Sequence, residues 1–259
     1  QNKSIDGIAI TVYATQLNSE FDSFNNTYDK DAEYVMRNAT IMSETDGKTF
    51  TLEAGKTYTV GVCQLVQHEA LDAATQGFVD ALKEALGDAV TIDVQNASGD
   101  SVNCGTIVNG FVSKGVDLIM ANATPALTAA VSATADIPIL GTSITAYGVA
   151  LDIDDFSGTV GGNVSGTSDL ADLQKQAQMI LDWFPETKTV GLLFCSAEPN
   201  SRYQIDEVRK ALEAQGVTCE EFAFTDSNDV SSVTQKAADF SDVVYIPTDN
   251  TAASNTEAI

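Results

Sequence analysis

Along most of the chain, short apolar runs alternate with longer stretches whose apolar residues recur at helical spacing. The run at 58–65, YTVGVCQL, predicts a buried strand, and the apolar positions of residues 71–86 predict a helix that ends near Gly87. Thr124 and Pro125 suit the N-cap and the first position of a later helix. The other strands of this half are expected at 90–94, 116–121 and 137–140, with helices between them.

The second half of the chain repeats the same order of elements. A helix over residues 169–184, ended by Pro185, bridges the two halves. The halves align with an offset of about 126–130 residues, which brings the loop 122–125 (NATP) onto 248–251 (TDNT). Strands are expected at 189–195, 217–224 and 242–247, followed by a final helix that begins near Thr251.

This alternation of strands and helices predicts the fold class. Strands joined by helices form parallel sheets with helices on both faces, so we expect an α/β protein with two Rossmann-like lobes. Two similar lobes in tandem are typical of hinged proteins that close around a small molecule. The sequence predicts a first lobe over residues 57–148 and a second lobe over residues 149–259.

Residues 1–56 do not follow the alternating pattern. They contain a strand-like run at 8–13, IAITVY, and residues 49–52 are expected to lie with 57–60 around a turn at 53–56. This segment forms either a small added β-rich element or a hairpin that extends the first sheet. We therefore predict a β-rich N-terminal extension, to which the sequence assigns no role.

Polar loops follow the predicted strands, at the ends where parallel α/β sheets bind their ligands. They are rich in Ser, Thr, Asn, Gln and Asp, and none contains Lys or Arg. Neutral donors and helix N-termini can hold a carboxylate without a cation, and a single acid such as Asp169 or Asp249 can face an ammonium group. The pattern favours a zwitterion such as an amino acid, although helix capping alone explains any one of these residues. The loops are residues 64–69, 122–125, 141–147, 161–169, 196–201 and 248–251.

The composition disfavours several classes of function. With 13 Lys and Arg against 37 Asp and Glu, the formal charge is −24, which argues against nucleic acid and anionic membrane surfaces as partners. His68 is the only histidine, and the sequence contains no nucleotide-binding glycine motif, metal-ligand motif or nucleophile elbow. We therefore expect no catalytic residue, no metal site and no cofactor. His68 itself either contacts a ligand, or caps or packs at the start of the helix that follows it.

Five segments of the sequence carry a resemblance to a known family. They are GVCQLVQHEALDAATQGFVDAL (61–82), DLIMANATPAL (117–127), GGNVSGTSD (161–169), SAEPNS (196–201) and YIPTDNT (245–251). Together they resemble the tryptophan/tyrosine-type substrate-binding proteins of ABC transporters, over about four-fifths of the chain. The resemblance implies a type I periplasmic-binding-protein-like fold, an aromatic amino acid as ligand and an ABC transporter permease as partner. It also implies an extracytoplasmic location, either periplasmic or as a membrane-anchored lipoprotein.

The resemblance also carries over a set of ligand-binding residues by motif. In the hypothesis that follows, Ser196 and the helix start at 198–201 hold the carboxylate of the ligand, and Asp249 holds its ammonium group. The full set is Gln64, Gln67, Asn122, Thr124, Thr142, Ser143, Thr167, Ser168, Asp169, Ser196, Glu198, Asn200, Thr248, Asp249 and Asn250.

Two features depart from the family pattern. Residues 1–56 do not resemble it, and family members continue for several elements beyond the position of Ile259, so the second lobe is expected to be incomplete. The same fold also serves as a ligand-sensing module that feeds a membrane receptor, which is the alternative function. An enzyme on a doubly wound fold is the least favoured interpretation, since fold alone does not confer catalysis.

Overall fold

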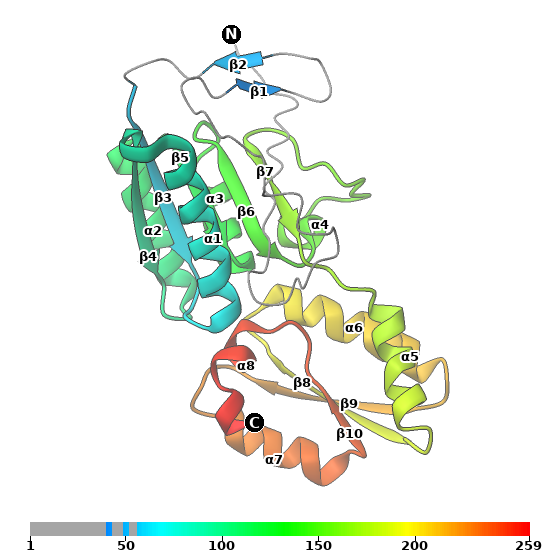
Figure 1. The fold of residues 1–259 in the computed structure, drawn as a ribbon. Coiled ribbons are helices and arrows are strands. Elements are labelled where there is room, and N and C mark those ends of the chain that lie inside the picture. The colour runs from blue at the N-terminus through cyan, green and yellow to red at the C-terminus, as the bar shows by residue number, and fades with distance from the viewer. Residues whose placement is uncertain (1–39, 43–48, 52–55) are drawn as a thin grey trace, which may run out of the picture.

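The protein folds into two α/β lobes that lie end to end (Figure 1). The computed structural model describes residues 40–42, 49–51 and 56–259. Within these residues the chain passes from the first lobe to the second between β7 (Val164–Ser168) and α5 (Leu173–Trp183). Each lobe contains a parallel sheet with helices on both faces, so the predicted fold class is confirmed.

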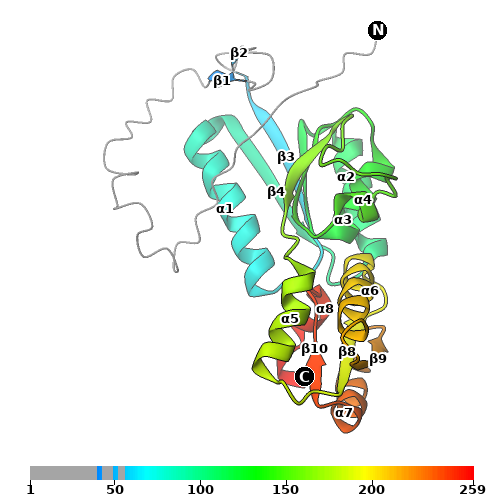
Figure 2. The same ribbon diagram turned by 90° about the vertical axis from the view of Figure 1, so that its right-hand side faces the viewer.

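The first lobe is built on a five-stranded parallel sheet in the order β4-β3-β5-β6-β7. Helix α1 covers one face, and α2 and α3 cover the other (Figure 2). Successive side chains of a strand point to opposite faces. Val60 and Val62 therefore pack with Met120 on the α1 face, whereas Cys63 and Leu65 pack with α2 and α3. The elements are β3 (Tyr58–Gln64), α1 (Glu69–Leu86), a 3-10 turn (Gly87–Ala89), β4 (Val90–Asn96), α2 (Ser101–Lys114), β5 (Leu118–Asn122), α3 (Thr124–Ala133), β6 (Ile139–Ile144), α4 (Tyr147–Ala150) and β7.

The second lobe repeats this plan on a three-stranded parallel sheet in the order β10-β8-β9. Leu192 and Phe194 pack with α5 and α6 on one face, and Leu193 and Cys195 pack with α7 and α8 on the other. The shared order of strand, helix and neighbouring strand confirms the internal repeat that the sequence pattern predicts. The elements after α5 are β8 (Thr189–Cys195), α6 (Pro199–Glu213), β9 (Thr218–Phe224), α7 (Val230–Phe240), β10 (Val243–Tyr245), α8 (Asn250–Ser254) and a 3-10 turn (Thr256–Ala258).

Two short strands precede the first lobe. β1 (Thr40–Met42) pairs antiparallel with β2 (Thr49–Thr51). The predicted pairing of 49–52 with 57–60 is wrong, because β3 pairs with β4 on one side and with β5 on the other. The strand-like run at 8–13 lies outside the described residues.

Strand β7 lies where the sequence predicts a polar loop at 161–169. It pairs in parallel with β6, beginning with Val164 opposite Ile139. As an edge strand with mostly exposed side chains, it has no apolar run by which the sequence could reveal it. The first sheet consequently continues beyond residue 148, where the sequence-based boundary ends the first lobe.

Two helices begin at other residues than the sequence predicts, and a side-chain cap explains the start of α5. Asp172 is the N-cap of α5, and its side chain accepts a hydrogen bond from the Lys175 amide at 3.1 Å, so the helix begins at Leu173 rather than at 169. Helix α3 begins at Thr124 with Ala123 as its N-cap, one residue earlier than predicted.

No helix in the described part of the chain combines the length and apolar character needed to cross a membrane.

Gly61 in β3 lies against the fully buried ring of Phe111. A Cβ at this position would lie 2.5 Å from the Cγ of that ring. Gly61→Ala is therefore expected to lower the free energy of unfolding by about 1–3 kcal/mol, because the core must shift to admit the methyl group. Gly110→Ala in α2, where a Cβ meets nothing within 4 Å, is the control and is expected to add up to about 1 kcal/mol. Urea unfolding measures both, and equal stabilities would contradict the packing argument.

Candidate functional site

The carboxyl ends of the strands in both lobes lie at the boundary between the lobes (Figure 1). A cavity of about 320 Å³ opens there. The first lobe contributes Leu65, Pro125 and the loop 98–101 to its lining, and the second lobe contributes Cys195, Glu198 and neighbouring polar residues. This volume lies within the range of roughly 300–1,000 Å³ that is usual for small-molecule sites.

A buried polar network braces the first-lobe side of this boundary. The Gln64 amide donates to the Asp72 carboxylate at 2.6 Å, and the Thr75 hydroxyl donates to Gln64 Oε1 at 2.6 Å. The Asn122 amide donates to Thr75 Oγ1 at 2.9 Å and to the Leu71 carbonyl at 2.8 Å. Gln64 and Asn122 thus tie the ends of β3 and β5 to helix α1.

Glu198 is the centre of a second polar network, on the second-lobe side of this boundary, and its side chain is only 3% exposed. Its Oε1 accepts from the Thr251 amide and hydroxyl, each at 2.8 Å. Its Oε2 accepts from the Asn250 amide nitrogen at 3.1 Å, from Asn250 Nδ2 at 2.6 Å and from Asn200 Nδ2 at 3.2 Å. One buried carboxylate therefore satisfies the donors at the beginning of α8.

Asp249 lies beside Glu198 and is also 3% exposed. It accepts from the Cys195 amide at 2.7 Å and, as the N-cap of α8, from the Ala252 amide at 2.8 Å. Burial, followed by the charge of Glu198, raises the pKa of Asp249 to about 6. Two acidic side chains are thus buried together next to the cavity.

Helix α6 adds a second connection to the same loop. Asn200 Nδ2 and Gln204 Nε2 each donate to the Thr248 carbonyl at 3.1 Å, and the Thr248 amide donates to Gln204 Oε1 at 3.1 Å. Sequence reasoning missed Gln204. The signal that could have found it is its spacing of four residues from Asn200, which places both on one face of a helix.

The candidate residues taken from the sequence differ widely in exposure. Two of them, Gln64 and Asn122, lie in the first-lobe network. Four others lie around the start of α8 in the second lobe: Glu198, Asn200, Asp249 and Asn250. Thr142 and Ser143 are half-buried at the end of β6. The buried members are Gln64, Asn122, Thr124, Glu198, Asn200, Asp249 and Asn250, and the exposed ones are Gln67, Thr167, Ser168, Asp169, Ser196 and Thr248.

Asp249 and Ser196, to which the sequence assigns specific roles, have partners within the second lobe. Asp249 is buried, and its side chain does not line the cavity. The Ser196 hydroxyl donates to the Phe224 carbonyl at 3.2 Å, so it has no second proton for a carboxylate. Among the candidate residues, Glu198 is the one that lines the cavity between the lobes.

Two neighbouring residues at the ends of β5 and β6 have a positive φ. Ala123 has φ +90° and Ser143 has φ +56°, and the Ala123 amide donates to the carbonyl next to Ser143, that of Thr142, at 3.1 Å. Residues other than glycine adopt such backbone only when the surrounding structure imposes it, and they cluster at binding sites. Their position between the candidate residues Asn122, Thr124 and Thr142 is consistent with a functional loop.

Tyr147, the first residue of α4, is a core residue. It is 6% exposed and packs within the first-lobe core. Its hydroxyl lies 3.0 Å from the Gly141 carbonyl and 3.2 Å from the Thr167 carbonyl, within reach of donation to either. Burial raises the pKa of Tyr147 well above its usual value.

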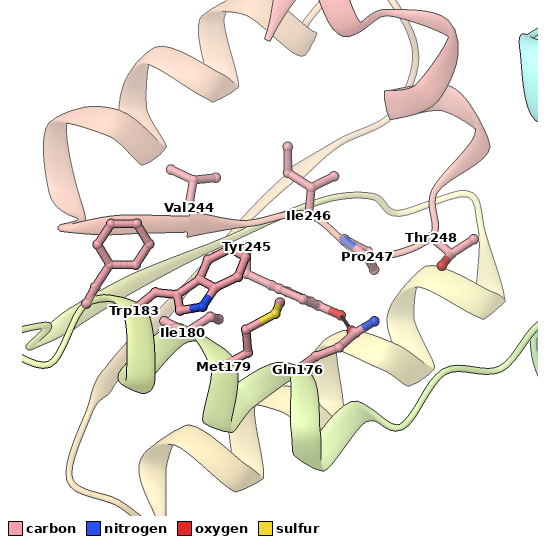
Figure 3. Close-up of a pocket in the computed structure, with 10 residues that line it drawn as sticks. Gln176, Met179, Ile180, Trp183, Val244, Tyr245, Ile246, Pro247 and Thr248 are labelled. Atoms are coloured by element: carbon pink, nitrogen blue, oxygen red, sulfur yellow. Dashed lines mark hydrogen bonds between the residues drawn. The ribbon is translucent and has the colours of Figure 1, made fainter. Parts of the chain in front are cut away.

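A second cavity, of about 400 Å³, lies within the second lobe between α5 and the end of β10 (Figure 3). Its lining is mainly apolar, and Trp183 and Phe184 are exposed beside it. The Tyr245 hydroxyl donates to Gln176 Oε1 at 2.7 Å across its floor. Thr248 is its only candidate residue, so this cavity does not unite the predicted site.

Comparison with known proteins gives a consistent picture. A family model described as "ABC transporter substrate binding protein" matches residues 59–259. The tyrosine-binding protein of Clostridioides difficile (strain R20291) is 34% identical over 224 residues, which cover 82% of this chain and 64% of that protein. The chain therefore spans less than two thirds of the length of this relative.

Solved structures agree with this match. The ABC domain in complex with L-Trp from Streptococcus pneumonia is 35% identical, with a TM-score of 0.73, covering 78% of this chain and 69% of that one. A conserved domain protein from Vibrio cholerae is 33% identical, with the same TM-score and the same coverage of both chains. A leucine-binding protein from Thermotoga maritima, at 14% identity and a TM-score of 0.54, covers 73% of this chain and 55% of that one and shares the fold alone.

Proposed function

Because the chain belongs to the family of ABC transporter substrate-binding proteins, we propose that it captures an aromatic amino acid between its two lobes. Proteins of this family bind and deliver solutes outside the cytoplasm and are not enzymes. The relatives described as tyrosine-binding and in complex with L-Trp support the ligand class. The observation that carries the proposal is the cavity that both lobes line at the ends of their sheets.

The chemistry of this cavity suits a zwitterion. None of its lining residues is Lys or Arg, and Glu198 contributes a buried negative charge on the second-lobe side. An ammonium group beside Glu198 offsets that charge, since buried charges require a partner. The neutral donors of Ser98 and Ser101 face the carboxylate, and Leu65 and Pro125 provide apolar contact for the side chain. Glu198 thereby takes the role that the sequence assigned to Asp249.

The proposal extends to the place of the protein in transport. The captured amino acid passes to an ABC transporter permease, and the protein is a membrane-anchored lipoprotein or a periplasmic protein. The permease recognises the closed conformation that the lobes adopt around the ligand.

Thermal unfolding with added amino acids tests the ligand class. L-tryptophan or L-tyrosine at about 100 times its dissociation constant is expected to add about 2.7 kcal/mol to the stability of the folded state. Tryptamine, which lacks the carboxylate, and indole-3-propionate, which lacks the ammonium group, are matched controls that are expected to give little shift. If none of the twenty amino acids raises the melting temperature of the folded protein, the proposed ligand class is wrong.

A further inference from the structure

The two lobes are joined by a hydrogen bond between side chains 182 positions apart in the sequence. His68 Nε2 lies 3.3 Å from Asn250 Oδ1. His68 stands at the start of α1 in the first lobe, and Asn250 is the first residue of α8 in the second. Across residues 56–259, no other side-chain hydrogen bond and no ion pair links the lobes.

The hydrogen-bond partners of His68 define which nitrogen carries its proton. Nδ1 accepts from the Leu71 amide at 3.5 Å as the N-cap of α1, so Nδ1 has no hydrogen. Nε2 then carries the hydrogen and donates to Asn250 Oδ1. The Asn250 amide in turn donates through Nδ2 to Glu198 Oε2 at 2.6 Å. A continuous chain of donors and acceptors therefore runs from α1 to Glu198.

The burial of the residues involved stabilises the hydrogen bonds from His68 through Asn250 to Glu198. Asn250 is 8% exposed and Glu198 is 3% exposed, and His68 is half-buried between the lobes. Hydrogen bonds in such sites are stronger than those in water. Glu198 and Thr251, at the second-lobe end of this series of hydrogen bonds, both line the cavity between the lobes.

We propose that His68 is the positioning residue for lobe closure, which it stabilises through Asn250 and Glu198. The inference rests on the proposed function in so far as closure encloses an amino acid. His68 touches the second lobe only when the lobes are together, so its hydrogen bond contributes to the closed state alone. A ligand that requires closure then binds more weakly when this hydrogen bond is lost.

Two substitutions separate the contact between the lobes from the cap of α1. His68→Asn retains an oxygen near the position of Nδ1 and loses the group that reaches Asn250. His68→Gln retains a donor near the position of Nε2 and loses the cap. Calorimetry with L-tryptophan and L-tyrosine is expected to show roughly three- to tenfold weaker binding for His68→Asn, the effect of one neutral hydrogen bond. His68→Gln is expected to bind within about twofold of wild type, at a reduced melting temperature.

Wild-type affinity in His68→Asn together with weak binding in His68→Gln would overturn the proposal, since His68 would then act only as a cap. A readout at the histidine itself, recorded with and without L-tryptophan, keeps the inference separate from the proposed function. Because the chain has one histidine, a long-range ¹H–¹⁵N spectrum reports this imidazole alone. The Nε2–H tautomer is expected, with a shift of the Nε2 signal in Asn250→Ala. A signal unchanged in that variant under both conditions rejects the contact, even if L-tryptophan binds.

Discussion

Glu198→Ala is expected to lower the free energy of unfolding by about 3–5 kcal/mol, the largest effect of any single substitution considered for this site. The Glu198 carboxylate accepts five hydrogen bonds, from donors on Asn200, Asn250 and Thr251. Hydrogen bonds to a charged group contribute about 1.5–3 kcal/mol each, and a buried donor left without a partner costs about 1–3 kcal/mol. Alanine removes every acceptor at once, and urea unfolding measures the loss.

Two further variants make the result specific. Glu198→Gln keeps one acceptor oxygen and is expected to lose about half as much stability. Glu84→Ala removes an exposed glutamate from α1 and is expected to change stability by no more than about 0.5 kcal/mol. A loss below about 1 kcal/mol for Glu198→Ala would mean that water replaces the carboxylate and that α8 does not depend on it. Hydrogen exchange at the α8 amides reports that dependence directly.

The buried strands could be predicted from the sequence because burial on both faces imposes a continuous apolar run. The run YTVGVCQL becomes β3, and TVGLLFC becomes β8 with the predicted bounds at Thr189 and Cys195. β7 could not be predicted, because an exposed edge strand needs only backbone pairing with β6. The pairing partner of β2 was missed for a related reason, since strands of three residues leave the register almost unspecified.

The candidate site shows the same limit at the level of side chains. Gln64 and Asn122, which the sequence places in loops after strands, are the last residues of β3 and β5. Glu198 and Asp249 follow the ends of β8 and β10. The direction of each side chain depends on partners far along the chain, such as Asn250 for Glu198. The sequence therefore locates these polar residues but does not distinguish a residue that braces a loop from one that contacts a ligand. The contact between His68 and Asn250 is invisible to any local pattern for the same reason.

Wild-type protein is expected to become more stable as the pH falls from about 6 to about 4, by more than a variant that lacks the Asp249 carboxyl group. The pKa of Asp249 is raised to about 6 by burial and by the facing charge of Glu198. The folded state therefore binds this proton more tightly than the unfolded state, in which an aspartate titrates near 3.9. Stability is greatest below the unfolded pKa and is lost as the pH rises through the folded one. Over this window the contribution is about 2 kcal/mol, because a tenfold change in a protonation equilibrium corresponds to roughly 1.4 kcal/mol.

Comparison with Asp249→Asn separates the contribution of Asp249 to the pH dependence of stability from that of the other acidic residues. At a formal charge of −24, protonation of many carboxylates relieves repulsion and also stabilises the fold at lower pH. Asp249→Asn should show only that general rise, while Asp80→Asn, an exposed aspartate on α1, should keep the full wild-type dependence at the same net charge. Urea unfolding at pH 7, 6, 5 and 4 provides the measurement. Parallel curves for wild type and Asp249→Asn would show that Asp249 is ionised as readily in the folded protein as in the unfolded chain.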